Sequence, residues 1–246
     1  MIDYKGAWYV LTPERVTALA NAGFYFFLPI YQNDAQIDAV LAAVPAGCPV
    51  CVLTSGDDAE KARQITRLKN HNTVTGFLID DETNLAGMST AVQAARYAWC
   101  KSVAPFKAVF GSYHVEPTGL ANPNNDSVVT AAGTAWDYLF VNFYPVTWGR
   151  TDTEAAEALT AACAATRQVF PVRCPIIPIE QAAGVVTETA GLCRPIGGLL
   201  QAQHDIWAAA GLVPLSAIVY YGDATNPETD NLTSNAELLA ESVSVE

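Results

Sequence analysis

The sequence is poor in charge, and positive charge is the scarcest. Only 15% of its 246 residues are charged, and 13 Lys and Arg stand against 25 Asp and Glu, which gives a formal net charge of -12. A protein this negative repels phosphate backbones and anionic lipid surfaces. We therefore expect neither a nucleic acid nor a membrane surface as a partner, whereas a neutral ligand is permitted. The oligomeric state is left open.

Long apolar runs are also missing. No run reaches the roughly 20 residues that a membrane-spanning helix requires, and the most apolar segment, residues 23–31, is interrupted by Pro29 and ends at Tyr31 and Gln32. Residues 1–5 lack the basic start and apolar core of a secretory signal. We expect no membrane insertion and no signal peptide, so that the chain is cytoplasmic or is exported or displayed by another route.

Cysteine and histidine are too sparse for a disulfide scaffold or a metal cluster. Six cysteines in a chain of this length are few. Cys48 and Cys51 are spaced as C-x-x-C, but no second pair follows, and strand positions three apart face opposite ways. His71, His114 and His204 fall on different predicted elements. We expect buried, reduced thiols, no metal and no cofactor.

One pattern recurs eight times along the chain: an apolar run rich in β-branched and aromatic residues, then polar residues, then an Ala-rich amphipathic segment. The predicted strands are residues 6–11, 24–30, 50–54, 74–79, 107–111, 138–144, 175–179 and 215–221. A helix is predicted after each, including 85–103 after the fourth and 127–135 after the fifth. Without a linker or an internal repeat, this order predicts an α/β protein with a single (β/α)8 TIM barrel over residues 1–246. The alternative, an open doubly wound sheet, lacks its glycine-rich phosphate loop.

The fourth predicted strand ends in three consecutive acids, Asp80, Asp81 and Glu82. An unpaired buried charge is costly, so these acids must lie at the open end of the strand or in a site. Alternation along the strand puts Asp80 and Glu82 on one face and Asp81 on the other. Two neighbouring carboxylates raise the pKa of one of them, as a general acid near neutral pH requires. The alternative, most fitting for Asp81, is that the acids favour the dipole of the following helix.

In a barrel of this kind the working side chains collect at the C-terminal ends of the strands. The sequence places acids, amides and aromatic residues there, and no Lys or Arg. The candidates are Tyr31, Gln32, Ser55, Asp80, Asp81, Glu82, Tyr113, His114, Asn142, Tyr144, Glu180, Gln181, Tyr220, Tyr221 and Asp223. Without cations, an anionic phosphate substrate is disfavoured. Carboxylates handle acetal cleavage and aromatic faces stack on sugar rings, so the set predicts a sugar as substrate or ligand.

Three segments at predicted strand ends share a pattern with a known family. Residues 75–82 read T-G-F-L-I-D-D-E, residues 137–144 read D-Y-L-F-V-N-F-Y, and residues 177–184 read I-P-I-E-Q-A-A-G. They resemble the fourth, sixth and seventh strands of chitinase-like family 18 glycoside hydrolases, whose fourth-strand signature is D-x-x-D-x-D-x-E. The last two acids of that signature match at Asp80 and Glu82, whereas Thr75 and Leu78 replace the first two.

The resemblance implies a substrate-assisted cleavage of an N-acetylated glycan. In it, Glu82 donates a proton to the glycosidic oxygen, Asp80 orients the N-acetyl group of the substrate, and Tyr144 hydrogen-bonds its carbonyl oxygen. That carbonyl oxygen is the nucleophile. The family's eighth-strand Trp is absent here, and Tyr220 or Tyr221 lies in its region.

Two alternatives remain open. A retaining glycosidase would use Glu82 as acid/base and Glu180 as nucleophile, with the two carboxyl groups about 5 Å apart. That class usually carries Asn before the strand-four acid, where this chain has Asp81. The other alternative is a barrel without activity that binds a glycan or serves as a structural surface module, for example of a virion, because a fold alone does not decide function.

Overall fold

The computed structural model describes residues 4–83, 86–120, 136–147, 149–170, 175–182, 184–185, 198–212, 217–221, 229–230, 232 and 235–245. Strands and helices alternate along most of the chain. The strands are β1 (Tyr4–Trp8), β2 (Phe26–Leu28), β3 (Val50–Leu53), β4 (Val74–Leu78), β5 (Ala108–Glu116), β6 (Gly119–Leu120), β7 (Tyr138–Asn142), β8 (Ile176–Gln181), β9 (Gly184–Val185), β10 (Ala217–Tyr221) and β11 (Thr229–Asp230). The helices are α1 (Pro13–Asn21), α2 (Asp34–Ala43), α3 (Asp58–Leu68), α4 (Thr90–Val103), α6 (Asp152–Val169), α7 (Leu199–Ala209) and α8 (Ala236–Ser244).

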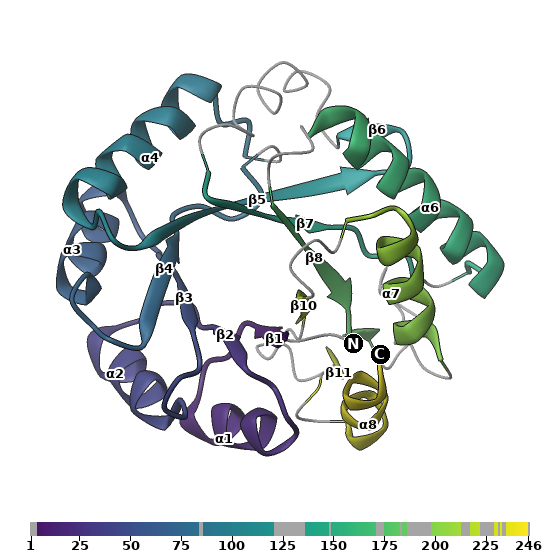
Figure 1. Cartoon of the computed structure of the whole chain (residues 1–246), viewed down its shortest axis with the longest axis horizontal. Helices are drawn as coiled ribbons and strands as arrows, with labels where there is room; N and C mark the ends of the chain where they lie inside the picture. Colours follow the sequence, from purple (N-terminus) through teal and green to yellow (C-terminus); the bar gives the residue numbers. More distant parts are fainter. Residues whose placement is uncertain are drawn as a thin grey trace.

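The main sheet is parallel and curled. Its order is β4-β3-β2-β1-β10-β8-β7-β5, and β5 also pairs in parallel with β4. The helices lie around the outside of this sheet (Figure 1). The predicted α/β class with a parallel sheet is therefore confirmed. The predicted helix at residues 127–135 lies outside the described residues, so the full eightfold βα repeat stays a prediction.

Short antiparallel strands supplement the sheet. β6 pairs with β5, which continues to Glu116, and β9 pairs with β11. The sequence predicts a fifth strand that ends at Gly111, whereas β5 continues beyond it and carries Ser112 and His114.

Helix starts follow from local side-chain chemistry. Thr12, Asn33 and Asp57 each accept a hydrogen bond from a backbone N–H in the first turn of α1, α2 and α3, a contact that typically contributes about 1 kcal/mol. Ser89 caps α4 in the same way, so this helix begins at Thr90. The prediction that it begins near residue 85 was therefore wrong, and the three acids after β4 do not lie in its first turn.

One hydrophobic cluster lies on each face of the sheet. The inner cluster lies on the face of the sheet that points into the space it encloses. It consists of Trp8, Phe26, Leu28, Cys51, Leu53, Leu78, Phe110, Phe140, Ile177 and Ile179. Its rings meet across the sheet, for example Trp8 on β1 with Phe140 on β7 at a centroid separation of 5.1 Å. The outer cluster packs the sheet against the helices and includes Phe77 and Ile79. Burial of each large side chain contributes roughly 1.5–3 kcal/mol.

The expectations about thiols and membrane spans can be compared with the described part of the chain. Cys48, Cys51, Cys100 and Cys163 are buried and unbridged, as expected. Among the described residues, no helix combines the length and apolar character needed to cross a membrane.

Candidate functional site

A cluster of polar side chains joins the C-terminal ends of three neighbouring strands. Glu82 follows β4, His114 lies on β5, and Asn142 ends β7. Asn142 Nδ2 donates to Glu82 Oε1 at 2.8 Å, and Asn142 Oδ1 lies 2.8 Å from His114 Nδ1. Because an amide oxygen only accepts, His114 Nδ1 carries the proton in this contact. Asn142 Nδ2 also donates to Tyr144 Oη at 3.2 Å.

The strand pairing explains why these residues meet. His114 and Asn142 are direct partners in the parallel register of β5 and β7, so their side chains lie next to each other on one face. Asn142 is 2% exposed, whereas the Glu82 side chain is 31% exposed. A buried amide thus holds one oxygen of a carboxylate that solvent can still reach. The predicted proximity of Glu82, His114, Asn142 and Tyr144 is observed, although their roles stay predictions.

The backbone bends sharply at this cluster. Among the described residues, only Tyr9 and Glu82 are non-glycine residues with positive φ, at 59° and 42°. Tyr9 follows β1 and Glu82 follows β4. Residues held in this sparsely populated region are found preferentially at functional sites. Tyr9 is not among the residues predicted for the site, because no pattern in the sequence marks a tyrosine with left-handed backbone.

Asp81 forms the second part of the site. Ser112 Oγ donates to Asp81 Oδ1 at 2.7 Å, and the Tyr9 hydroxyl donates to Asp81 Oδ2 at 3.4 Å. Burial raises the pKa of Asp81 to about 6; the Ser112 hydrogen bond opposes this rise and the negative charge of Glu82 adds to it. Burial and the charge of Asp81 likewise raise the pKa of Tyr9. With its pKa raised to about 6, Asp81 can hold a proton at mildly acidic pH.

Asp80 does not lie beside Glu82, which corrects the alternation argument. Its carboxylate forms ion pairs with Lys61 on α3, at 2.5 Å, and with Arg96 on α4. The Asp80 side chain is 10% exposed and faces the helices. Alternation fails because β4 ends at Leu78, so the chain beyond that residue is no longer a regular strand. Asp81, and not Asp80, is the acid near Glu82.

Glu180 also faces the helices, which corrects its expected position in the mouth of the barrel. On β8, Ile177 and Ile179 belong to the inner cluster, so Glu180 points to the other face. It is fully buried, and its Oε1 lies 3.4 Å from Nδ1 of His204 on α7. Burial raises the pKa of Glu180 to about 7, and the His204 contact opposes this rise. A pairing of Glu82 with Glu180 across the site is not observed.

Several other candidates also face away from the cluster. Tyr31 is buried and donates to Asp34 Oδ1 on α2 at 2.5 Å. Gln32 is exposed on the surface beside α2, where its N–H donates to Gln36 Oε1. Tyr31 and Gln32 were expected at the mouth of the barrel, but the short β2 ends at Leu28, and its alternation does not extend to them.

The remaining candidates lie behind the sheet or outside the described residues. Ser55 Oγ donates to the Tyr31 carbonyl, and Tyr113 Oη donates to Gln93 on α4. Gln181 is fully buried, and its amide is hydrogen-bonded to the backbone of Val146. The backbones of Tyr220 and Tyr221 form the end of β10, but their side chains and all of Asp223 lie outside the described residues.

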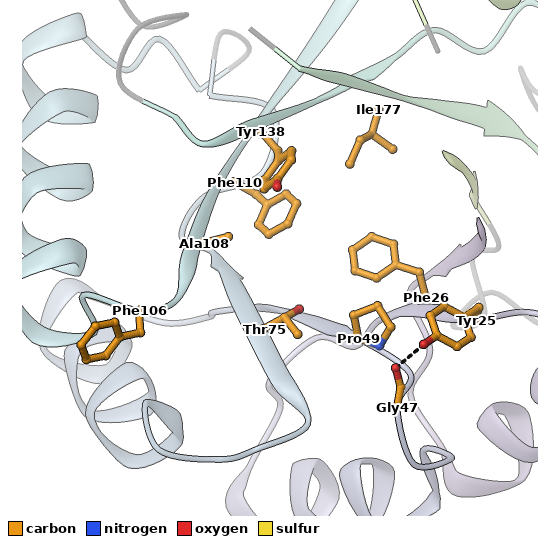
Figure 2. A pocket seen from close by; sticks show the side chains of 10 residues that line it. All are labelled: Tyr25, Phe26, Gly47, Pro49, Thr75, Phe106, Ala108, Phe110, Tyr138 and Ile177. Carbon is orange, nitrogen blue, oxygen red and sulfur yellow. Dashed lines mark hydrogen bonds between the residues drawn. The ribbon is translucent and has the colours of Figure 1, made fainter. Parts of the chain in front are cut away.

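A separate pocket lies at the opposite end of the sheet. It has a volume of about 550 Å³ and is lined by residues at the starts of strands, among them Phe26, Ala108, Tyr138 and Ile177. Figure 2 shows Phe26, Phe110, Tyr138 and Ile177 turned toward this space, with Phe106 at its edge. Among the described residues, its lining is mainly aromatic and aliphatic and includes no carboxylate. This pocket is therefore distinct from the cluster around Glu82.

Metal ligands do not gather within the described part of the chain. No group of three or more His, Cys, Asp and Glu residues there is placed to hold a metal ion. His114 contacts the amide of Asn142 and the carboxylate of Glu82. The side chains of Glu82, Asp81, His114 and Tyr144 offer the cluster hydrogen-bond donors and acceptors and groups that can exchange protons.

Sequence comparisons find no match: no protein-family model fits the chain, and no curated protein sequence resembles it significantly. Solved structures do resemble it. A β-galactosidase from the Antarctic haloarchaeon Halorubrum lacusprofundi superposes with a TM-score of 0.75 and 10% identity, over 98% of this chain and 57% of that one. The chain spans less than two thirds of the length of the β-galactosidases that it matches.

Two further structures match most of both chains. The β-1,3-glucanosyltransferase of Rhizomucor miehei, an active-site mutant in complex with laminaritriose, has a TM-score of 0.62 and 16% identity, with 89% and 86% coverage of this chain and that one. The catalytic domain of a hyperthermophilic chitinase from Pyrococcus furiosus has a TM-score of 0.59 and 14% identity, with 89% and 83% coverage. At these identities the likeness concerns the fold alone. The chain has a glycoside hydrolase-like α/β fold built on a curled parallel sheet.

Proposed function

We propose that this protein is a glycoside hydrolase with one (β/α)8 domain, acting on a neutral or N-acetylated glycan at the cluster around Glu82. One observation carries the proposal: the partly exposed Glu82 carboxylate is held by the buried Asn142 amide, beside His114 and Tyr144. The fold is shared with solved glycosidases. Carboxylates at the C-terminal ends of strands are where barrel enzymes carry their chemistry.

In the proposed reaction Glu82 is the general acid. It gives its proton to the glycosidic oxygen as the bond from that oxygen to the sugar breaks. The carbonyl oxygen of the substrate's N-acetyl group attacks the anomeric carbon, and Tyr144 hydrogen-bonds this group. Water then opens the cyclic intermediate and returns a proton to Glu82. Asp81 takes the place that the family resemblance gave to Asp80, since Asp80 is paired with Lys61.

The test is the release of reducing ends from chitin, peptidoglycan and neutral glycans. We expect turnover by the wild type and its loss in Glu82→Gln, because the amide has the same shape but no acidic proton. Glu157→Gln, at an exposed position on α6, makes the same chemical change away from the site and serves as the control. Equal turnover by Glu82→Gln and Glu157→Gln, with circular dichroism showing both folded, would contradict the proposal.

A second candidate is a glycan-binding or structural module without activity. It is favoured by the positions of Asp80 and Glu180, which are both held against helices and leave fewer acids for catalysis. In this case the wild type retains a glycan in affinity electrophoresis without releasing product, and Glu82→Gln retains it equally. Release of product by the wild type would exclude this candidate.

A further inference from the structure

The amide of Gln181 holds the loop that follows β7. Val146 N–H donates to Gln181 Oε1 at 2.9 Å, and Gln181 Nε2 donates to the Val146 carbonyl at 2.9 Å. One side chain thus satisfies both backbone groups of Val146, in the way that a neighbouring strand would. Gln181 is 0% exposed and Val146 is 8% exposed, so water does not compete for these bonds.

Gln203 on α7 makes the same kind of paired contact with the backbone of Gln181, farther from the site. Gln181 N–H donates to Gln203 Oε1 at 3.0 Å, and Gln203 Nε2 donates to the Gln181 carbonyl at 3.1 Å. Gln203 is 3% exposed. Two buried amides in series therefore connect α7, the end of β8 and the loop after β7.

The loop held in this way carries a member of the cluster around Glu82. Tyr144 precedes Val146 by two residues, and its hydroxyl accepts from Asn142, which also donates to Glu82. Side-chain packing does not fill the space beside this loop, because a pocket of about 260 Å³ lies between Pro145, Val146 and the helices α6 and α7. Apart from the glutamine, Arg150 Nη1 holds the Pro145 carbonyl at 2.8 Å.

We propose that Gln181 and Gln203 are positioning residues: their paired amide contacts fix Val146 and thereby the place of Tyr144 beside Asn142 and Glu82. The effect on catalysis rests on the proposed function, whereas the effect on the place of Tyr144 does not. Neither glutamine touches the substrate. Gln181, expected from the sequence to bind the substrate directly, acts through the loop instead.

The geometric part is tested by the imidazole signals of His114 in NMR. Its ring lies 6.4 Å from the Phe143 ring and 6.2 Å from the Tyr144 ring, centroid to centroid, so a displaced loop changes its ring-current shift. Gln181→Met removes the amide at similar length. We expect the His114 signal to shift in Gln181→Met and to stay in Gln168→Met, an exposed position on α6. An unchanged His114 signal in folded Gln181→Met would overturn the inference.

A second variant, Gln181→Glu, provides the same NMR test in case Gln181→Met does not fold. A protonated Glu still donates an O–H to the Val146 carbonyl and accepts from Val146 N–H, whereas an ionised Glu offers only acceptors. We expect the His114 signal to match the wild type at acidic pH and to depart from it as the new carboxyl ionises. The inference is contradicted when the His114 signals of Gln181→Glu and the wild type do not differ, or differ by the same amount at every pH.

Turnover separates this inference from the proposed function. With an active wild type, we expect kcat of Gln181→Met to fall on the order of 10- to 100-fold while KM stays within about twofold, because misplaced groups impair the reaction more than binding. A higher KM at unchanged kcat counts against positioning. With an inactive wild type and a shifted His114 signal, the positioning stands and the proposed function fails.

Discussion

Two strands of the same sheet, β4 and β8, end in acids, but only the segment after β4 turns an acid, Glu82, to Asn142. On β8 the strand continues through Gln181, and regular alternation turns Glu180 outward to His204 on α7. After β4 the strand stops at Leu78, and the chain then turns Asp80 to the helices and Glu82 to Asn142. Alternation therefore predicts the direction of a side chain only as far as the strand itself continues.

The electrostatic consequences of the two strand ends differ as well. Behind β8, neither carboxylate oxygen of Glu180 has a hydrogen-bond partner within the described residues, although His204 lies nearby. At the end of β4, Asp81 accepts from Ser112 and Tyr9, and Glu82 accepts from Asn142. Burial without hydrogen bonds raises the free-energy cost of ionising a carboxylic acid. Asp81 and Glu82 are thus held by hydrogen bonds, whereas Glu180 is buried without them, so that its ionisation costs stability.

The sharpest test of this contrast compares Glu82→Gln with Glu180→Gln. We expect Glu82→Gln to lower kcat on the order of 10²- to 10⁴-fold, the usual contribution of a general acid. Glu180→Gln should act on stability instead, because its side chain faces α7. Steady-state kinetics of both folded variants decides the matter. A loss of similar size in Glu180→Gln would mean that Glu180 reaches the substrate.

Glu180 also makes stability depend on pH. Its pKa is raised to about 7 in the folded protein, above the value of about 4.3 for an unperturbed Glu. The folded state therefore binds the proton more tightly, and stability falls as pH rises from about 4.5 to 7, by an amount on the order of 3 kcal/mol. Urea unfolding from pH 5 to 8 should show this fall in the wild type and a smaller one in Glu180→Gln. An equal pH dependence of the free energy of unfolding in both proteins would show that Glu180 does not cause this fall.

A third test concerns the ion pairs of Asp80. Asp80→Asn removes the carboxylate that Lys61 and Arg96 share, although Arg96 keeps its ion pair with Asp58. We expect a loss of about 2 kcal/mol in the free energy of unfolding. Turnover by the protein that remains folded should be close to that of the wild type. The opposite result, full stability with lost turnover, would return to Asp80 the role that the family resemblance implies.

The smallest expected effects concern the partners of Asp81. Ser112 donates at 2.7 Å and Tyr9 at 3.4 Å. Both bonds favour the ionised carboxylate, so Ser112→Ala should raise the pKa of Asp81 above about 6, and Tyr9→Phe should raise it less. Each change should cost about 1 kcal/mol or less in stability. A carbon-13 NMR titration of the aspartates measures the shifts. A larger rise of the Asp81 pKa in Tyr9→Phe than in Ser112→Ala would contradict this order of the two hydrogen bonds.

Part of the site could be predicted from the sequence for a physical reason. Glu82, His114, Asn142 and Tyr144 each follow or end an apolar run, and parallel strands bring such ends to one edge. The register of β5 and β7 then makes His114 and Asn142 neighbours. Ser112 and Tyr9 carry no comparable signal, because a serine in a strand and a tyrosine after one are common in any α/β protein.

The sequence by itself determined the α/β class and the order of the described parallel strands and long helices, because periodicity and helix caps act over a few residues. Only the tertiary structure decided which acids face the same space. That choice depends on where β4 stops, on the left-handed backbone at Glu82, and on the cations of α3 and α4 that hold Asp80. These partners are distant in sequence, so no local pattern contains them.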